Sequence, residues 1–391
     1  MKLTVAGLMS GTSFDGVDAA VAEFDLEGND LVCRPLGLLS HVLTDAMRTR
    51  IADVLPPNST TMAEICRLDT ELGQLFGRVA AEAIDSYGPV DLVASHGQTV
   101  FHWVADGSAL GTLQLGAAAW IAEATGAPVL SDLRTRDIAR GGQGAPLAPT
   151  LDALLLLADD VRRGALNLGG IANITVRDHD HRVLGYDLGP ASALMDLAVS
   201  TATGGRERMD TDGRRAARGM VDDSLLQRLL DEPYYRLEPP KSTGKELFDA
   251  DYLRRVVRDH DLGENDHDLD DLVATLTELT ARLVADACSR WGLRELVTSG
   301  GGIRNPTLMR RITELAQPTV LRTSDDFGIP AQAKECYLMA LLGFLSWHGL
   351  PGTIESATGA TSLLGSLTPG AGPLQLPEPL TVAPSRMIIR A

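Results

Sequence analysis

The chain carries one strand–turn–strand pattern twice, and this repetition restricts its possible folds more than any other feature of the sequence. In the first copy, strand-like residues 3–8 and 17–24 flank a glycine-containing turn at residues 9–16. The second copy runs from Ala165 to Val176, with Gly169 and Gly170 in its turn. Glycine permits a tight bend that other residues resist. The repetition therefore predicts a duplicated architecture with two related units.

The segment between the two copies alternates between strand-like and helix-like patterns. Residues 61–87 have apolar positions at helical spacing, and residues 91–94 follow as a short buried strand. A second helix over 115–125 precedes a strand over 127–130. This alternation predicts an α/β fold with a largely parallel inner sheet. Since 391 residues exceed what one core usually serves, we expect two domains, 1–145 and 146–391.

Charge and cysteine content exclude several classes of protein. The formal net charge of −17 argues against a nucleic-acid or anionic-membrane partner, which would require a basic surface. The four cysteines are far apart and form no Cys-x-x-Cys pair, which favours a reducing compartment and buried thiols. No apolar run reaches membrane-spanning length, and the N-terminus has no signal-peptide pattern. The sequence thus predicts a soluble cytoplasmic protein.

The first turn has the composition of a phosphate site. Backbone N–H groups and hydroxyls in a small concavity suit phosphate oxygens, which need donors and tolerate little bulk. Asp15 and Asp18 could hold Mg²⁺ through water or simply cap the turn. From this local sequence alone, an ordinary hairpin turn fits about as well as a phosphate site. The residues concerned are Gly11, Thr12, Ser13, Phe14, Asp15, Gly16, Val17 and Asp18.

Two further glycine turns strengthen the case for a nucleotide. Residues 167–170 form a second donor-rich bend, and residues 298–305 link a strand to a helix starting near Pro306. Gly-rich strand-to-helix loops let the backbone lie against a nucleotide. The P-loop and dinucleotide fingerprints are both absent, and the tempting segment 241–245 lacks the upstream glycines of a P-loop. A nucleotide bound by several glycine turns is the resulting hypothesis.

Long sequence blocks in a fixed order carry a family resemblance. They are residues 9–18, 95–102, 112–116, 132–134, 137–147, 167–175, 240–246, 299–305 and 357–360. Through these blocks the chain resembles the anhydro-N-acetylmuramic acid kinases of the hexokinase–actin–heat-shock-70 superfamily. The resemblance implies two RNase-H-like domains around a central cleft, with C-terminal helices partly packing back on the first domain. It also implies a homodimer.

The resemblance implies a double reaction that uses ATP and Mg²⁺. Water attacks the anomeric carbon of 1,6-anhydro-N-acetylmuramic acid, and the freed O6 takes the γ-phosphate. The products would be N-acetylmuramic acid 6-phosphate and ADP, in the recycling of cell-wall sugar. The implied ATP-binding residues are the turn at 11–18 together with Gly169, Gly170, Asn173, Gly300, Gly301, Gly302 and Asn305.

The resemblance also assigns roles to single side chains. The family's general base falls on Asp187, although local sequence alone favours a plain N-cap there. Glu335 matches a sugar-contacting glutamate, and Arg134 suits a sugar or carboxylate clamp. His96 and Gln98 are expected on a strand-end loop that contacts the sugar, although a structural role for His96 is nearly as good.

Three positions depart from the family pattern. Leu188 and Ser192 stand where the family has Thr and Asn after its base, and Gln332 stands where it tends to have Asp. These departures keep open a kinase for a simpler anhydro-sugar such as levoglucosan. A catalytically weak nucleotide-binding protein of the same superfamily is the alternative from another class. A glycosidase with paired carboxylates would leave the glycine turns unexplained.

Overall fold

The computed structural model describes residues 2–11, 14–105, 107–157, 160–244, 247–257 and 266–390. The chain divides into two compact units, the first comprising Met1–Leu155 and Phe327–Ala391 and the second Leu156–Asp326. This division follows helix α5 (Ala148–Leu155), whereas the sequence placed the boundary just before it. Leu151 of α5 is fully buried in the core of the first unit, a contact that local sequence does not reveal.

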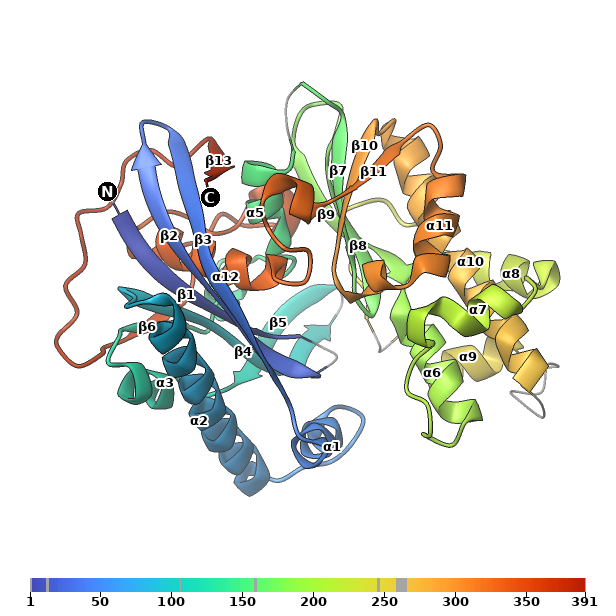
Figure 1. Cartoon of the computed structure of the whole chain (residues 1–391), viewed down its shortest axis with the longest axis horizontal. Helices are drawn as coiled ribbons and strands as arrows, with labels where there is room; N and C mark the ends of the chain where they lie inside the picture. The colour runs from blue at the N-terminus through green and yellow to red at the C-terminus, as the bar shows by residue number, and fades with distance from the viewer. Residues whose placement is uncertain are drawn as a thin grey trace. The chain divides into compact units, whose positions relative to one another are not determined.

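The first unit is built on a mixed sheet (Figure 1). Strands β1 to β3 are antiparallel neighbours, and β4 and β6 continue the sheet as parallel strands on the other side of β1. The strand order is β12-β6-β4-β1-β2-β3-β13, and β5 pairs with β4. The strands are β1 (Lys2–Ser10), β2 (Gly16–Glu27), β3 (Asp30–Val42), β4 (Leu92–Ala105), β5 (Ser108–Leu115), β6 (Val129–Ser131), β12 (Ser366–Thr368) and β13 (Arg386–Ile389).

Helices cover both faces of this sheet. The long helix α2 begins after the N-cap Thr61, whose side chain accepts from the Glu64 N–H, and buries its apolar stripe on one face with α3. Helices α5 and α12 bury the opposite face. A Cβ on Gly7 of β1 would lie 2.0 Å from the Cys336 carbonyl oxygen, so glycine is required where α12 crosses. The helices are α1 (Asp45–Val54), α2 (Met62–Tyr87), α3 (Ala118–Thr125), α4 (Thr135–Ala139), α5, α12 (Lys334–Trp347) and α13 (Glu355–Thr358).

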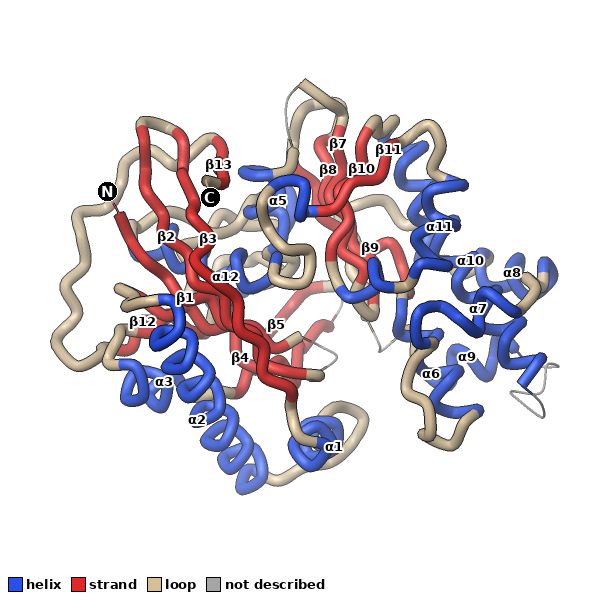
Figure 2. The backbone as a smooth tube through the Cα atoms, in the orientation of Figure 1, coloured by secondary structure: helices blue, strands red, loops and turns tan. Residues whose placement is uncertain are grey.

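The second unit has a five-stranded sheet in the order β11-β10-β7-β8-β9 (Figure 2). Its strands are β7 (Arg163–Leu168), β8 (Ile171–Arg177), β9 (Val183–Pro190), β10 (Glu295–Ser299) and β11 (Val320–Thr323). Its helices are α6 (Ser192–Ala202), α7 (Arg214–Arg218), α8 (Asp223–Leu230), α9 (Ala250–Val257), α10 (Asp266–Trp291) and α11 (Pro306–Leu315). Short 3₁₀ turns are η1 (Thr211–Gly213), η2 (Pro233–Arg236), η3 (Gly301–Arg304) and, at the junction of the units, η4 (Ser324–Phe327).

The two units share one topology. In each, three antiparallel strands joined by hairpins are followed by two strands parallel to the first, in the order third-second-first-fourth-fifth. For the first unit this core is β3-β2-β1-β4-β6, and for the second it is β9-β8-β7-β10-β11. This arrangement confirms the predicted RNase-H-like duplication.

Several local expectations were wrong. His96 and Gln98 do not lie on a loop after a strand, because β4 continues through them and forms a hairpin with β5. Residues 367–391 are proline-rich and without clear periodicity, which predicts an irregular terminal arm, but they end in strand β13, which pairs in parallel with β3. Of the four free cysteines, Cys66 is exposed on the solvent side of α2, while the other three are buried.

Among the described residues, no helix has the length and apolarity needed to span a membrane.

Candidate active site

The first glycine turn is a tight link between β1 and β2. The Phe14 N–H donates to the Gly11 carbonyl over 3.0 Å, and Phe14 has a positive φ of 41°. A Cβ on Gly16 would lie 2.6 Å from the His41 carbonyl oxygen, so only glycine fits beside β3. Asp15 is largely exposed, and Val17 is fully buried against α2. Thr12 and Ser13, which the sequence assigned to phosphate, lie outside the described residues.

Gln98 holds this turn in place through hydrogen bonds to Ser10 and Gly11. Its Oε1 lies 2.7 Å from the Ser10 hydroxyl, and its Nε2 donates to the Thr99 carbonyl (3.1 Å) and the Gly11 carbonyl (3.4 Å). Ser10 also lies 2.9 Å from the Gly16 carbonyl, so the two buried side chains connect both ends of the turn. The contacts show that Gln98 holds the first glycine turn; its contact with a sugar, like phosphate binding by the turn, stays a prediction.

His96 and Arg134 form a buried pair in the first unit. The Arg134 Nε donates to His96 Nε2 over 3.0 Å, and Arg134 Nη1 donates to the Gly144 carbonyl over 2.8 Å. His96 Nδ1 must then carry the hydrogen, and it lies 2.9 Å from the Gly97 carbonyl. Burial and the Arg134 charge lower the pKa of His96 to about 3. Burial also lowers the pKa of Arg134 to about 10, so the pair is a neutral imidazole beside a cation.

This depressed pKa predicts a pH-dependent stability. Unfolding frees His96 to bind a proton below pH 6.5, so the stability present above pH 6.5 is lost as the pH falls toward 3. Between pH 7.5 and pH 5 the loss from this group is about 2 kcal/mol. We expect His96→Gln to remove that part of the decline in urea unfolding, while exposed His41→Gln leaves it unchanged. An unaltered pH profile in His96→Gln would contradict the burial argument.

Two carboxylates influence each other where α12 packs on β2. Glu335, in the first turn of α12, is partly buried, and Asp18 of β2 is near enough for its charge to act on Glu335. Burial raises the pKa of Glu335, and the Asp18 charge acts in the same direction, while Lys334 and Arg134 oppose it. A cation at this position would relieve the repulsion between the two carboxylates. Among the residues with described positions, no cluster of three or more acidic, His or Cys side chains forms a metal site of its own.

A buried ion pair holds the helix that carries Glu335. The Lys334 Nζ lies 2.7 Å from the Asp152 Oδ1, and both side chains are nearly inaccessible, with 4% and 2% of their area exposed. Asp152 belongs to α5, so the pair joins two helices that cover the same face of the first sheet. This contact fixes the first turn of α12 and therefore the position of Glu335.

A cavity of about 220 Å³ adjoins His96 within the first unit. It is lined mainly by polar groups from α2, β4, β5 and the segments that follow β5 and β6. The Ser95 hydroxyl in its wall is buried and has no hydrogen-bond partner among the residues that the structure describes, while the Asp69 carboxylate accepts from the Gly116 N–H over 2.8 Å. An unpaired buried hydroxyl favours a polar ligand here, because an unmet donor costs free energy.

The second unit presents a row of polar side chains across its sheet. Ser299, Asn167, Asn173 and Asp187 are successive partners on β10, β7, β8 and β9. Directly paired residues point to the same face of a sheet. Their chain neighbours, among them Leu188, point to the opposite face and enter the hydrophobic core. Pairing therefore brings together two residues, Asn173 and Asp187, that the sequence assigned separately to ATP and to catalysis.

Asp187 is held by a segment far from it in sequence. Its Oδ2 accepts from the Ser242 hydroxyl (3.0 Å) and from the Thr243 N–H (2.9 Å). Its backbone N–H donates to the Lys241 carbonyl (3.2 Å), and its carbonyl accepts from the Tyr234 hydroxyl (2.8 Å). Sequence reasoning missed this group, although a run of Lys, Ser, Thr and Gly after two prolines is a donor-rich turn.

The two remaining glycine turns lie against each other in the second unit. A Cβ on Gly300, which has a φ of 88°, would lie 2.7 Å from the Leu168 carbonyl oxygen, and one on Gly302 would lie 2.7 Å from the Leu168 Cβ. Gly169 and Gly170 direct their carbonyls to the first N–H groups of α6, including that of Ser192 at 3.1 Å. Glycine is thus required for the contact between the turns, and Gly301 is exposed beside it.

Asn305 ends the glycine loop and starts α11. Its Oδ1 accepts from the Leu308 N–H over 3.0 Å, so the side chain is an N-cap, with Pro306 in the first turn. Gly213 of η1 packs directly on it, because a Cβ there would lie 2.1 Å from the Asn305 Oδ1. Thr307 donates to the Gly213 carbonyl over 2.8 Å. The start of α11 is therefore fixed by η1.

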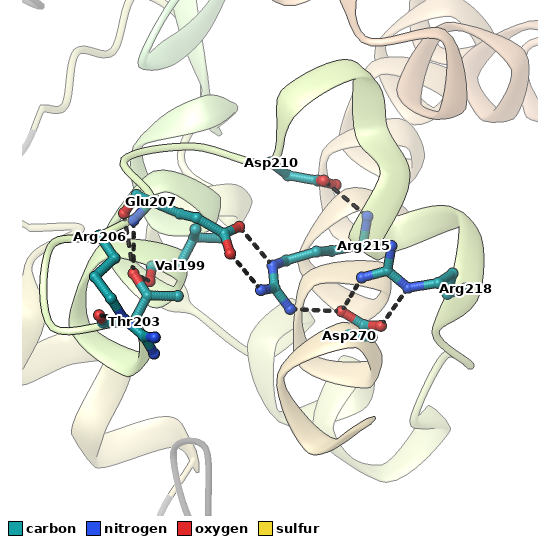
Figure 3. A network of polar contacts seen from close by, with 8 residues as sticks. All are labelled: Val199, Thr203, Arg206, Glu207, Asp210, Arg215, Arg218 and Asp270. Atoms are coloured by element: carbon teal, nitrogen blue, oxygen red, sulfur yellow. Dashed lines mark hydrogen bonds and ion pairs between the residues drawn. The ribbon is translucent and has the colours of Figure 1, made fainter. Parts of the chain in front are cut away.

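A charge network anchors η1 and α7 (Figure 3). Arg215 donates to both Glu207 oxygens (2.8 and 3.0 Å) and to Asp270 at the start of α10 (2.9 Å). Arg218 donates to both Asp270 oxygens, and the Asp210 carboxylate accepts from the Arg215 N–H over 2.8 Å. The network ties the segment that supports Asn305 to the longest helix of the second unit.

The structure describes all three residues that depart from the family pattern. Leu188 is buried in the core opposite Asp187, so its side chain leaves the polar row intact. Ser192 starts α6, where its N–H meets the Gly169 carbonyl. Gln332 is exposed just before α12. None of the three removes a described contact of Asp187.

Comparison with known proteins places the chain among relatives of similar length. The family model for anhydro-N-acetylmuramic acid kinase matches residues 3–370. Proteins named anhydro-N-acetylmuramic acid kinase from Streptomyces coelicolor and Streptomyces avermitilis are 54% and 50% identical, over 96% and 99% of this chain and 96% and 100% of theirs. The protein of that name from Rhodococcus erythropolis is 48% identical over the full length of both chains.

Proposed function

Because the chain belongs to the anhydro-N-acetylmuramic acid kinase family, we propose that it opens the 1,6-anhydro ring of 1,6-anhydro-N-acetylmuramic acid and phosphorylates O6 with ATP. Water forms a bond to C1 as the C1–O6 bond breaks, and O6 takes the γ-phosphoryl group while ADP leaves. The water's proton goes to a carboxylate. The products are N-acetylmuramic acid 6-phosphate and ADP, which return cell-wall sugar to metabolism.

The observation that carries the proposal is the placement of Asp187 at the end of the polar row, with its carboxylate oriented by two donors. We assign it the general base, because neutral water is a poor nucleophile and such assistance is worth about 10²–10⁴ in rate. Asn173 beside it and the glycine loop at 300–302 are assigned to ATP, as is the turn at 11–18.

For the sugar we assign the groups around His96 in the first unit. Arg134 is a cation with an adjacent neutral imidazole, Glu335 is a partly buried carboxylate, and the cavity beside His96 offers hydroxyls and carboxylates to a polar substituent. Bound Mg²⁺ would neutralise charge on the ATP phosphates. The carboxylate Asp18 next to Glu335, and the exposed Asp15, fit a hydrated cation of this kind. A cytoplasmic homodimer completes the proposal.

Substrate competition tests this function. We expect the purified protein with Mg·ATP to convert 1,6-anhydro-N-acetylmuramic acid to its 6-phosphate at a far higher kcat/KM than levoglucosan, with one ADP formed per sugar phosphate. The measurement is product formation by liquid chromatography with mass spectrometry. Preferred turnover of levoglucosan would overturn the substrate assignment, and ADP formation without a sugar phosphate would overturn the kinase assignment.

A further inference from the structure

The segment Pro239–Gly244 surrounds the proposed base without belonging to the sheet that carries it. It follows η2 and contains the sequence Pro-Pro-Lys-Ser-Thr-Gly. Asp187 lies in the second half of β9, more than fifty positions earlier in the chain. The segment nevertheless makes three hydrogen bonds to Asp187, and Tyr234 of the preceding η2 makes a fourth.

The contacts close a ring around the base. The Asp187 N–H donates to the Lys241 carbonyl (3.2 Å), the Lys241 Nζ donates to the Tyr234 carbonyl (3.1 Å), and the Tyr234 hydroxyl donates back to the Asp187 carbonyl (2.8 Å). Lys241 also reaches the Tyr235 carbonyl (3.1 Å), and its ammonium lies 4.6 Å from the centre of the Tyr234 ring. Each member of the ring is held by the other two, so the backbone at Asp187 is fixed from outside the sheet.

One side-chain donor and one backbone donor act on the carboxylate itself. Rotation about the last bond of an aspartate side chain has broad, nearly two-fold preferences, so the ring alone does not orient the carboxylate. The Ser242 hydroxyl and the Thr243 N–H both donate to Oδ2 and thereby set the plane of the carboxylate. Ser242 is exposed, so this bond is not required to satisfy a buried hydroxyl.

We propose that Ser242 is a positioning residue for the general base, and that Lys241 holds the segment that presents it. This inference rests on the proposed function, since it concerns the same water attack. Small misplacements of a reacting group reduce rate without reducing binding. Losing one of the two described donors to Asp187 Oδ2 should therefore lower kcat and leave both KM values unchanged.

The test compares Ser242→Ala with a matched control elsewhere in the second unit. Ser224 also donates its hydroxyl to an aspartate, Asp222, over 2.7 Å at the exposed start of α8. We expect Ser242→Ala to lower kcat by about 10- to 100-fold, the range for a hydrogen bond to a charged group. Ser242→Thr should restore most of the rate, Lys241→Met should lower kcat as well, and Ser224→Ala should match the wild type.

Several results would contradict the positioning role of Ser242. Full kcat in Ser242→Ala, an equal loss in Ser224→Ala, or a rise in KM at constant kcat would overturn the positioning role while leaving the proposed function in place. The affinity for ADP, measured by calorimetry, should be the same in all four variants. Weaker ADP binding in Ser242→Ala would also overturn the positioning role of Ser242. A wild type that forms no sugar phosphate would overturn the proposed function and this inference together.

Discussion

Asp187→Asn should nearly abolish sugar phosphate formation while nucleotide binding stays nearly intact. The amide has the size of the carboxylate, and its oxygen can still accept from Ser242 and from the Thr243 N–H, so the surroundings persist. It cannot take a proton from water, and we expect kcat to fall by about 10²–10⁴. The measurements are steady-state product formation and calorimetric titration with ADP.

The control for this variant is an aspartate of the same unit with an exposed side chain. Asp231 pairs with Arg236 at the surface over 3.1 Å, with 76% of its side chain exposed. Asp231→Asn should retain the wild-type kcat. Wild-type kcat in Asp187→Asn would mean that another group accepts the proton, and loss of ADP binding in this variant would mean that Asp187 maintains the fold.

Asp152→Asn should destabilise the first unit strongly. It leaves the Lys334 ammonium buried without its carboxylate partner, a change that typically costs about 3–5 kcal/mol. For a unit of this size, each kcal/mol lowers Tm by roughly 2–4 °C, so we expect a decrease of about 6–20 °C. Thermal unfolding monitored by circular dichroism measures this decrease in Tm.

Two further variants show whether the lower Tm comes from the unpaired buried charge of Lys334 or from any loss of an aspartate charge. Asp180→Asn breaks an exposed contact with Arg182, and pairs of that kind contribute about 1 kcal/mol at most. Asp152→Leu combined with Lys334→Met removes both charges and should recover much of the loss in Asp152→Asn, since apolar replacements of buried pairs are often tolerated. A Tm for Asp152→Asn equal to that of Asp180→Asn would contradict the assignment.

The regular elements of the fold were predictable because they carry local signals. The helical spacing over 61–87 corresponds to α2, and the first two glycine turns correspond to the hairpin that opens each unit. Strand β13 was not predictable, because four residues of a proline-rich arm have no periodicity and their partner β3 is more than 350 residues away. The strand character of His96 and Gln98 depends on pairing with β5, which local sequence does not encode.

The candidate site was predictable only in part, because contacts between distant segments of the chain hold its residues in place. The family resemblance named Asp187, Arg134 and Glu335, but the groups that hold them come from distant segments. Asp187 depends on residues 241–243, and the helix of Glu335 depends on Asp152, 182 residues before Lys334. Such contacts result from tertiary packing, and no spacing in the sequence indicates them. The departure at Leu188 was also ambiguous until its side chain was located in the core.

The central claim is that water opens the anhydro ring while ATP phosphorylates the freed O6. Incubation with Mg·ATP and 1,6-anhydro-N-acetylmuramic acid in ¹⁸O-water, followed by mass spectrometry of the product, tests it directly. We predict one ¹⁸O atom at C1 of the 6-phosphate and none in its phosphate group. A phosphorylated product that keeps its anhydro ring, label in the phosphate, or ring opening without ATP would each contradict the account.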